Sequence, residues 1–358
     1  MFHEVDKKRM EGFVKLSGIG GSRADYVQGG GGNTSVKLPN GMMAIKASGF
    51  CLKDIQMDSG YVFLNGAALR KFYLENEPEN FEDCEKAGAQ CAKENILTVE
   101  GLPQLRPSVE AGFHSILKTY VLHTHSIFAN LAACTVGGRA IAEEALKDAP
   151  YSWGWVDYQD PGAKLAFAIR DEMNRVEKET GKVPAVIMMQ NHGIIVHDDD
   201  EVSCLAIHAD ANVRLAAYFG LAENAFPATT IEELAGGIYR ATTPYLKEKL
   251  QNCAFTQEQL LYEPLYPDQM VFLVGTYYQD QDTVEEGQAV SSNKTGELVM
   301  RMSKQKAQAL TEILTAVFFI NEHVQKAGHR VAAMSDAARN FIENWESEKY
   351  RKSLNEKK

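Results

Sequence analysis

Two short apolar runs in the sequence each end directly in polar residues and histidine. The first run, at 120–122, is followed by His123-Thr124-His125, and the second, at 185–189, by Gln190-Asn191-His192. Short apolar runs of this kind are typical of buried β-strands, and the polar residues mark the strand ends. Longer helical patterns lie at about 108–118, 126–134, 163–180, 200–221 and 230–250. Because short strands alternate with longer helices, we expect an α/β layered fold.

After about Cys253 the sequence becomes richer in Tyr, Pro and acidic residues. Its predicted elements are strands at 270–275 and 297–302 and two amphipathic helices, at about 304–327 with Ser303 as N-cap and from about Ser335. No Ser/Pro-rich linker is present, so we predict that residues 253–358 form an α+β extension packed against residues 1–252.

The composition, 45% hydrophobic and 24% charged in 358 residues, is that of a globular protein and excludes disordered, collagen-like and coiled-coil classes. No window holds the roughly 18 consecutive apolar residues of a membrane span, and the N-terminus lacks the apolar segment of a secretory signal. We therefore expect a cytoplasmic protein without a membrane partner. Six cysteines without a C-x-x-C pair predict reduced thiols rather than disulfides or a thiolate zinc site.

The net charge is −11, from 37 Lys and Arg against 48 Asp and Glu. A chain with this charge repels polyanions, so we expect no nucleic-acid partner. An anionic small molecule would have to be bound by a local site.

His123 and His125 are candidate metal ligands, because residues two apart on a strand project from the same face. His192, just past the second apolar run, would be the third ligand, and three histidines with an open position are the usual composition of a catalytic zinc site. H-x-H pairs also occur by chance, and His192 before Gly193 also fits an ordinary turn. The sequence leaves both interpretations open.

A run of four glycines at 29–32, followed by Asn33-Thr34-Ser35, leads into a predicted β-hairpin at about 35–46 with an Asn40-Gly41 turn. Such a run is typical of a flexible loop, but it also lets backbone N–H groups approach an anion. Neither a P-loop nor a G-x-G-x-x-G motif is present, so this is not a nucleotide-binding loop of the usual kinds.

Glu110 lies in the segment Arg106-Pro107-Ser108-Val109-Glu110, at the start of a predicted helix. A glutamate there most often only interacts favourably with the helix dipole. Beside a metal, in a water-poor pocket that raises its pKa, the same carboxylate would serve as a general base. Both roles remain open from the residues alone.

Together these motifs resemble the class II aldolase/adducin family of zinc-dependent sugar-phosphate aldolases, which includes fuculose-1-phosphate and rhamnulose-1-phosphate aldolases. The resemblance covers about residues 8–250 and rests on five motifs in order, namely G-N-T-S, S-G, P-S-x-E, H-x-H and H-G. The longer form, with VQGGGGNTSVK, RPSVE and a tail beginning Pro264-Leu265-Tyr266-Pro267-Asp268, is more similar to the aldolase portion of bifunctional rhamnulose-1-phosphate aldolase/alcohol dehydrogenases. The glycine pattern of the dehydrogenase portion does not occur after residue 253.

The resemblance implies a three-layer α/β/α fold around a mostly antiparallel sheet, with residues 1–252 as the catalytic domain. It also implies that Glu110 is the acid/base and that a zinc ion, or another divalent ion such as Mn²⁺ or Co²⁺, is held by His123, His125 and His192. The residues implied to line the substrate phosphate pocket are Gly32, Asn33, Ser48, Gly49 and Ser108. Val109 stands where many members have a second hydroxyl residue; Lys46 and Arg106 would replace that donor, or the ligand would carry a carboxylate.

The implied function is a metal-dependent lyase of carbohydrate metabolism that cleaves a ketose phosphate, or a similar sugar derivative, to dihydroxyacetone phosphate and an aldehyde through a zinc-stabilised enediolate. The alternatives are a decarboxylase or an epimerase of a sugar-acid or sugar phosphate on the same scaffold. A non-catalytic, adducin-like module is a further alternative, against which the three histidines and the glutamate argue. The resemblance also implies a homotetramer whose site is often completed by a neighbour's tyrosine.

Overall fold

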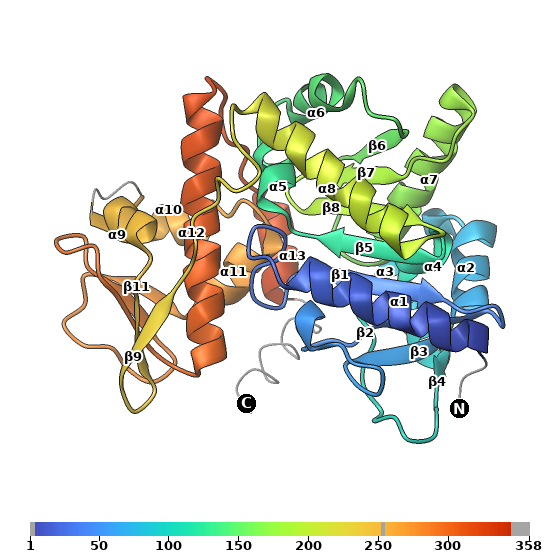
Figure 1. The fold of residues 1–358 in the computed structure, drawn as a ribbon, viewed down its shortest axis with the longest axis horizontal. Helices are drawn as coiled ribbons and strands as arrows, with labels where there is room; N and C mark the ends of the chain where they lie inside the picture. Colours follow the sequence, from blue (N-terminus) through green and yellow to red (C-terminus); the bar gives the residue numbers. More distant parts are fainter. Residues whose placement is uncertain (1–3, 252–254, 345–358) are drawn as a thin grey trace.

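The computed structural model describes residues 4–251 and 255–344, and its larger part is built on an eight-stranded sheet (Figure 1). The strand order is β4-β3-β2-β1-β5-β8-β7-β6. The strands are β1 (Asn33–Lys37), β2 (Met42–Lys46), β3 (Tyr61–Asn65), β4 (Ile96–Leu97), β5 (Tyr120–Thr124), β6 (Trp153–Val156), β7 (Val186–Met189) and β8 (Gly193–Asp198). Every neighbouring pair is antiparallel except β6 and β7, which confirms the mostly antiparallel sheet expected from the sequence.

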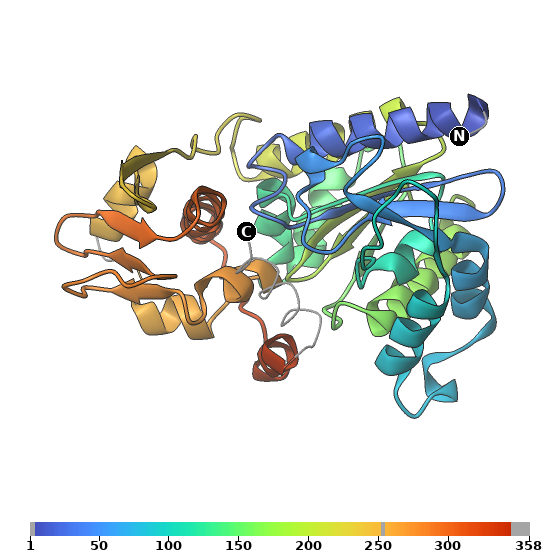
Figure 2. The same cartoon turned by 90° about the horizontal axis from the view of Figure 1, so that it is seen from below.

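Helices cover both faces of this sheet, so the architecture is the predicted α/β/α sandwich (Figure 2). One face carries α1 (Glu4–Gly21), α5 (Ile127–Ala133), α6 (Gly138–Leu146) and α8 (Glu201–Tyr218), and the other α2 (Gly66–Glu75), α3 (Cys84–Glu94), α4 (Ala111–Ile116) and α7 (Ala163–Thr180). Neighbouring residues of a strand point to opposite faces. On β5, Leu122 accordingly packs in the first layer, and Val121 packs with Phe113 and Phe167 in the second.

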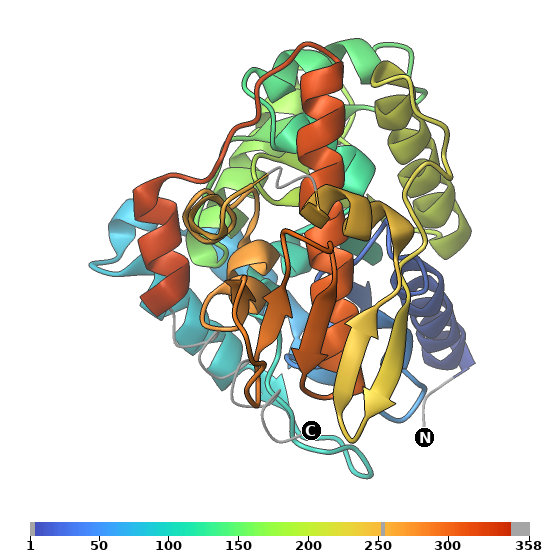
Figure 3. The ribbon, with the colours of Figure 1, turned by 90° about the vertical axis from the view of Figure 1, so that its left-hand side faces the viewer.

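Five strands form a second sheet in the order β11-β12-β13-β10-β9. They are β9 (Ile231–Ala235), β10 (Ile238–Ala241), β11 (Tyr277–Gln279), β12 (Ala289–Ser291) and β13 (Leu298–Arg301). Helix α12 (Lys304–Lys326) lies between the two sheets and contacts α5 on one side and β9 and β10 on the other (Figures 1 and 3). The remaining helices are α9 (Pro244–Gln251), α10 (Gln257–Tyr262), α11 (Pro267–Leu273) and α13 (Asp336–Asn344).

One apolar cluster runs through the whole molecule, with Leu122 from the larger sheet, Leu314 from α12 and Met300 from the second sheet among its members. The strands β9 and β10, which precede residue 253, pair within the second sheet. The division of the chain into residues 1–252 and 253–358 stays a prediction.

Two predicted elements are wrong. Residues 231–241, within the predicted helix at 230–250, form the β9–β10 hairpin, because Gly236 and Gly237 adopt positive φ angles of 38° and 81° that end any helix. The apolar run at 270–275, predicted as a strand, lies largely in helix α11, which begins with Pro267 at its first turn. A short apolar run fits a strand or a buried helix equally well, and proline at the first helical position favours the helix.

The other predicted elements are confirmed. The hairpin at 35–46 is formed by β1 and β2, and Ser303 caps α12 by accepting a hydrogen bond from the backbone N–H of Lys306. No disulfide forms among the described cysteines, which are Cys51, Cys84, Cys91, Cys134 and Cys204; Cys253 lies outside the described residues. Among the described helices, none combines the length and the apolar character needed to cross a membrane.

Candidate metal centre and substrate pocket

Glu110, His123, His125 and His192 come together at one end of the larger sheet, and we call them the Glu/His cluster. His123 lies on β5 and His125 follows the end of that strand, while His192 lies in the turn between β7 and β8. Glu110 is the N-cap residue of α4. Because β5 and β8 are neighbours in the sheet, the two segments recognised as strand ends in the sequence meet at the same edge.

The potential ligand atoms of the Glu/His cluster all lie within 4.8 Å of one another, and all four residues are buried. Oε1 of Glu110 is 3.4 Å from Nε2 of His123 and 3.3 Å from Nε2 of His192. The Nε2 atoms of His123 and His125 are 3.2 Å apart. Three imidazole nitrogens and a carboxylate at this spacing are a donor set that Zn²⁺ accepts, so the residues present fit a divalent metal ion.

Hydrogen bonds on the far side of two imidazole rings direct their Nε2 atoms into the cluster. His123 Nδ1 donates to the carbonyl of Ile194 at 3.0 Å, and His125 Nδ1 donates to Oδ2 of Asp268 at 2.5 Å. Carbonyl and carboxylate oxygens only accept, so each ring carries its proton on Nδ1 and presents the lone pair of Nε2.

The turn that carries His192 is held by its two neighbours in sequence. Asn191 adopts φ of 51°, and its side-chain amide donates to the carbonyls of Leu265 and Ala332 at 2.9 and 2.7 Å. A Cβ atom on Gly193 would lie 2.3 Å from the carbonyl oxygen of Thr124. The segment is therefore a tight turn, which is one of the two interpretations left open from the sequence. The same turn places His192 in the Glu/His cluster, which agrees with the other.

The electrostatics favour an ionised Glu110 and a neutral His192. Burial raises the pKa of the Glu110 carboxyl, but the interaction with the imidazoles of His123 and His192 outweighs burial, and the pKa lies well below its usual range. This is the opposite of the shift expected from burial alone. Burial lowers the pKa of His192 to about 4 despite its hydrogen bond to Glu110. A neutral imidazole is the form that binds metal.

A pocket opens beside the Glu/His cluster and is lined by Glu110, His125 and His192 among others. It is lined by all five residues predicted for the phosphate site, namely Gly32, Asn33, Ser48, Gly49 and Ser108. Asn33 links the Glu/His cluster to the predicted phosphate site. Its side-chain nitrogen donates to Oε2 of Glu110 at 3.0 Å and to the hydroxyl of Ser108. Among the described residues, Asn33 Oδ1 has no hydrogen-bond partner although it is buried, so it is available to a ligand.

Lys46 and Val109 also line this pocket, whereas Arg106 does not. The Lys46 side chain is only 5% exposed, and its ammonium group donates to the carbonyls of Phe50 at 2.8 Å and Gly30 at 3.3 Å. Lys46 is therefore a basic residue in the lining of the pocket, whereas Arg106 is exposed.

Asp268 is a residue of the site that sequence reasoning did not single out. It lies in the first turn of α11, 143 residues after its partner His125, and it lines the pocket with Pro267 and Ile342. The segment Pro264–Asp268 appears in the sequence only as part of a family resemblance, and nothing in its spacing indicates which histidine it meets.

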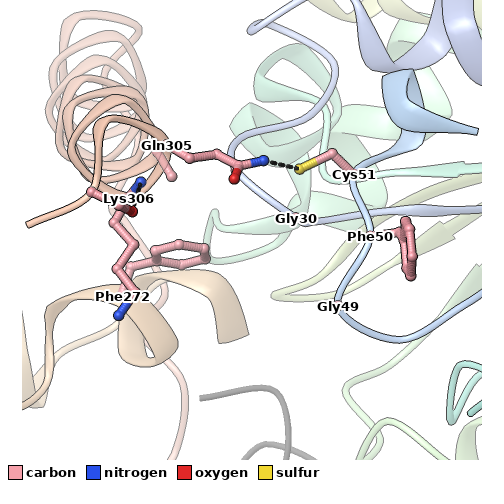
Figure 4. A pocket seen from close by; sticks show the side chains of 10 residues that line it. Gly30, Gly49, Phe50, Cys51, Phe272, Gln305 and Lys306 are labelled. Atoms are coloured by element: carbon pink, nitrogen blue, oxygen red, sulfur yellow. Dashed lines mark hydrogen bonds between the residues drawn. The ribbon is translucent and has the colours of Figure 1, made fainter. Parts of the chain in front are cut away.

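A second cavity adjoins the first and shares Gly30 and Gly49 with it (Figure 4). Its far wall is formed by Phe272 of α11 and by the first turn of α12, where Gln305 reaches toward Cys51. The glycine-rich loop is thus enclosed between the larger sheet and the C-terminal helices.

The profile of a family described as Class II Aldolase and Adducin N-terminal domain matches residues 21–209, which include the whole Glu/His cluster. No curated protein matches the chain. Among solved structures, the N-terminal class II aldolase domain of a conserved protein from Thermoplasma acidophilum is 21% identical with a TM-score of 0.47, and the match covers 61% of this chain and 94% of that one. YgbL from Escherichia coli is 17% identical with a TM-score of 0.42, and the match covers 65% of this chain and 97% of that one. L-fuculose-1-phosphate aldolase from Thermus thermophilus is 13% identical with a TM-score of 0.34, and the match covers 58% of this chain and 94% of that one.

Proposed function

The chain belongs to the class II aldolase and adducin family, and on that premise we propose that it is a metal-dependent carbon–carbon lyase. The proposed reaction cleaves a ketose phosphate, or a similar sugar derivative, into dihydroxyacetone phosphate and an aldehyde. The observation that carries this proposal is the buried Glu/His cluster beside a pocket lined by glycines and by Ser48 and Ser108. An assembly module has no need for such a set of converging polar side chains.

In the proposed site, His123, His125 and His192 hold a zinc ion, or Mn²⁺ or Co²⁺ in its place. When bound, the ion would supply a Lewis acid for the carbonyl and hydroxyl oxygens of the substrate. Glu110 lies close enough to the imidazoles to share in holding the ion before substrate enters. The zinc ion would also add a positive charge that this acidic chain needs beside an anionic substrate.

Glu110 is the proposed acid/base. Its low pKa means that it begins as a carboxylate, which can accept a proton from the substrate hydroxyl as the carbon–carbon bond breaks. The same proton can then be returned to the carbon of the departing fragment. Asn33 holds Oε2 of Glu110, which leaves Oε1 facing the imidazoles.

The proposed phosphate site is formed by Gly32, Asn33, Ser48, Gly49 and Ser108, with the Lys46 ammonium group as its positive charge. We further propose that the chain works as a homo-oligomer, in the simplest case a tetramer, in cytoplasmic carbohydrate metabolism.

A decarboxylase acting on a 3-oxo sugar-acid phosphate is the second candidate. It is favoured by two lining residues, the buried cation Lys46 and the apolar Val109, because a carboxylate needs a cation more than it needs another hydroxyl donor. An epimerase would use the same metal and the same carboxylate.

A substrate screen separates these reactions. Purified protein loaded with Zn²⁺ is given ketose 1-phosphates and 3-oxo sugar-acid phosphates, and both aldehyde release and CO₂ release are measured. The proposed function predicts aldehyde together with dihydroxyacetone phosphate from a ketose 1-phosphate. CO₂ release from an oxo acid without any aldolase turnover would replace the aldolase by the decarboxylase.

A further inference from the structure

The C-terminal part of the chain reaches into the Glu/His cluster through the first turn of α11. Asp268 is 1% exposed, and its Oδ2 accepts the hydrogen bond from His125 Nδ1 at 2.5 Å. The His123 ring is oriented by the carbonyl of Ile194 on β8, within the larger sheet. His192 is placed by its turn, which Asn191 ties to the C-terminal part of the chain through the carbonyls of Leu265 and Ala332. His125 is the member whose ring is oriented by a residue beyond that sheet.

The residue after Asp268 anchors this turn of α11 to the preceding segment. The side-chain nitrogen of Gln269 donates to the carbonyl of Leu260, and its side-chain oxygen accepts from the backbone N–H of Leu265, both at 2.8 Å. The carbonyl of Leu265 in turn accepts from the side chain of Asn191, the neighbour of His192. Tyr266 is fully buried, with its ring centroid 6.3 Å from that of His125.

The glycine-rich loop closes over this pair from the opposite side. A Cβ atom on Gly31 would lie 2.3 Å from Oδ2 of Asp268 and 2.9 Å from Nδ1 of His125. Only a residue without a side chain can therefore pass over the hydrogen bond. The loop, the metal ligand and α11 form one packed unit at this point.

We propose that Asp268 is a positioning residue that fixes His125 in the tautomer and orientation needed to bind the metal ion, so that the C-terminal extension is part of the metal site. The carboxylate keeps the ring proton on Nδ1 and turns Nε2 toward the Nε2 of His123. Without this acceptor the ring can carry its proton on Nε2, which removes one ligand from the site. This proposal rests on the proposed metal site and deepens it.

The test uses Co²⁺ as the probe, because its visible absorption reports the geometry of the ligands. Affinity is measured at fixed pH by competition with a chelating indicator, for the full-length wild type, Asp268→Asn and Asp268→Ala. Loss of a hydrogen-bond partner behind a metal ligand typically weakens binding about 10–100-fold, so we expect a loss of that size with an altered absorption spectrum in Asp268→Ala. The loss should be smaller in Asp268→Asn, because the amide oxygen can still accept from His125 Nδ1. Far-UV circular dichroism shows whether each variant is folded.

Two further variants make the result specific. Gly31→Ala crowds the same hydrogen bond without touching its chemistry, and it is expected to weaken Co²⁺ binding as well. Asp336→Asn removes an aspartate that is also in the first turn of a helix but is exposed, and it is expected to bind Co²⁺ like the wild type.

Folded Asp268→Ala with wild-type affinity and spectrum would overturn the positioning role, and so would an equal loss in Asp336→Asn. If Asp268→Ala and Asp268→Asn fail to fold, wild-type Co²⁺ affinity in Gly31→Ala overturns it and a weakened one supports it. If His123→Ala binds Co²⁺ as tightly as the wild type, that result would instead overturn the metal site and the proposed function.

Discussion

Glu110 and its neighbours show how one carboxylate can be kept ionised although it is buried. Desolvation alone would favour the neutral acid, but the imidazoles of His123 and His192 and the amide of Asn33 all favour the anion. A carboxylate held in this state can accept a proton from a substrate without first losing its own. The residue is therefore suited to begin a cleavage reaction as the base.

Replacing Glu110 by Gln removes the proton acceptor while leaving the three imidazoles. We expect the purified variant to keep its metal content and to lose about 10²–10⁴-fold in kcat on whichever substrate the screen identifies, a typical contribution of general acid–base catalysis. Steady-state kinetics with elemental analysis measures both quantities. Glu100→Gln, at an exposed glutamate, serves as the control. Full kcat in the Glu110 variant would rule out the proposed role.

Single site residues could be predicted from the sequence where a local pattern marks them. His123, His125, His192 and Glu110 could all be proposed because each lies at or just past the end of a strand or begins a helix, and the structure brings them together. Asp268 could not be proposed, since its partner lies 143 residues away and only the fold makes them neighbours.

Among the secondary-structure elements, helix α12 packs between the two sheets and connects their apolar cores. Its buried side chains include Leu314 and Val317, which belong to the same apolar cluster as residues of both sheets. Removal of a buried leucine side chain leaves a cavity that its neighbours fill only in part.

Leu314→Ala is therefore expected to lower the free energy of unfolding by about 2–5 kcal/mol. Gln325→Ala, at an exposed position near the end of the same helix, should change it by less than about 0.5 kcal/mol. Urea denaturation followed by circular dichroism measures both. Equal effects of the two substitutions would show that α12 does not join the sheets through its buried face.

The elements that the sequence predicted correctly carry strong local signals, such as the Asn40-Gly41 turn and the Ser303 cap. The two errors lie where the local signal for the other type of element decides the outcome. The Gly236-Gly237 pair ends the predicted helix at 230–250, and Pro267 begins a helix in the apolar run at 270–275 that was predicted as a strand.

For the whole molecule, histidines buried in the neutral form set the response to acid. Burial lowers the pKa of His197 and of His208 from 6.5 to about 3 in each case. Below pH 6.5 the unfolded chain takes up protons on these residues while the folded chain does not. Stability that is complete above pH 6.5 is therefore lost as the pH falls from 6.5 toward 3.

His208→Gln removes one of these groups and can keep a hydrogen bond to the Thr124 hydroxyl, which His208 contacts at 2.7 Å. Each such histidine contributes about 1.4 kcal/mol of destabilisation per pH unit below pH 6.5. We expect the unfolding free energy of the variant to fall less steeply than that of the wild type by this amount between pH 6 and pH 5. Denaturant titrations at the two pH values measure the slopes, and parallel slopes would contradict the buried neutral histidine.

The proposed function requires one divalent ion per chain, held by histidines from two neighbouring strand ends. Elemental analysis of the purified wild type against His123→Ala, His125→Ala and His192→Ala tests this claim most directly, with circular dichroism to show that the variants are folded. We predict about one equivalent of a divalent metal, zinc in the first place, in the wild type and a large loss in each variant. Equal metal content in all four proteins would contradict the account.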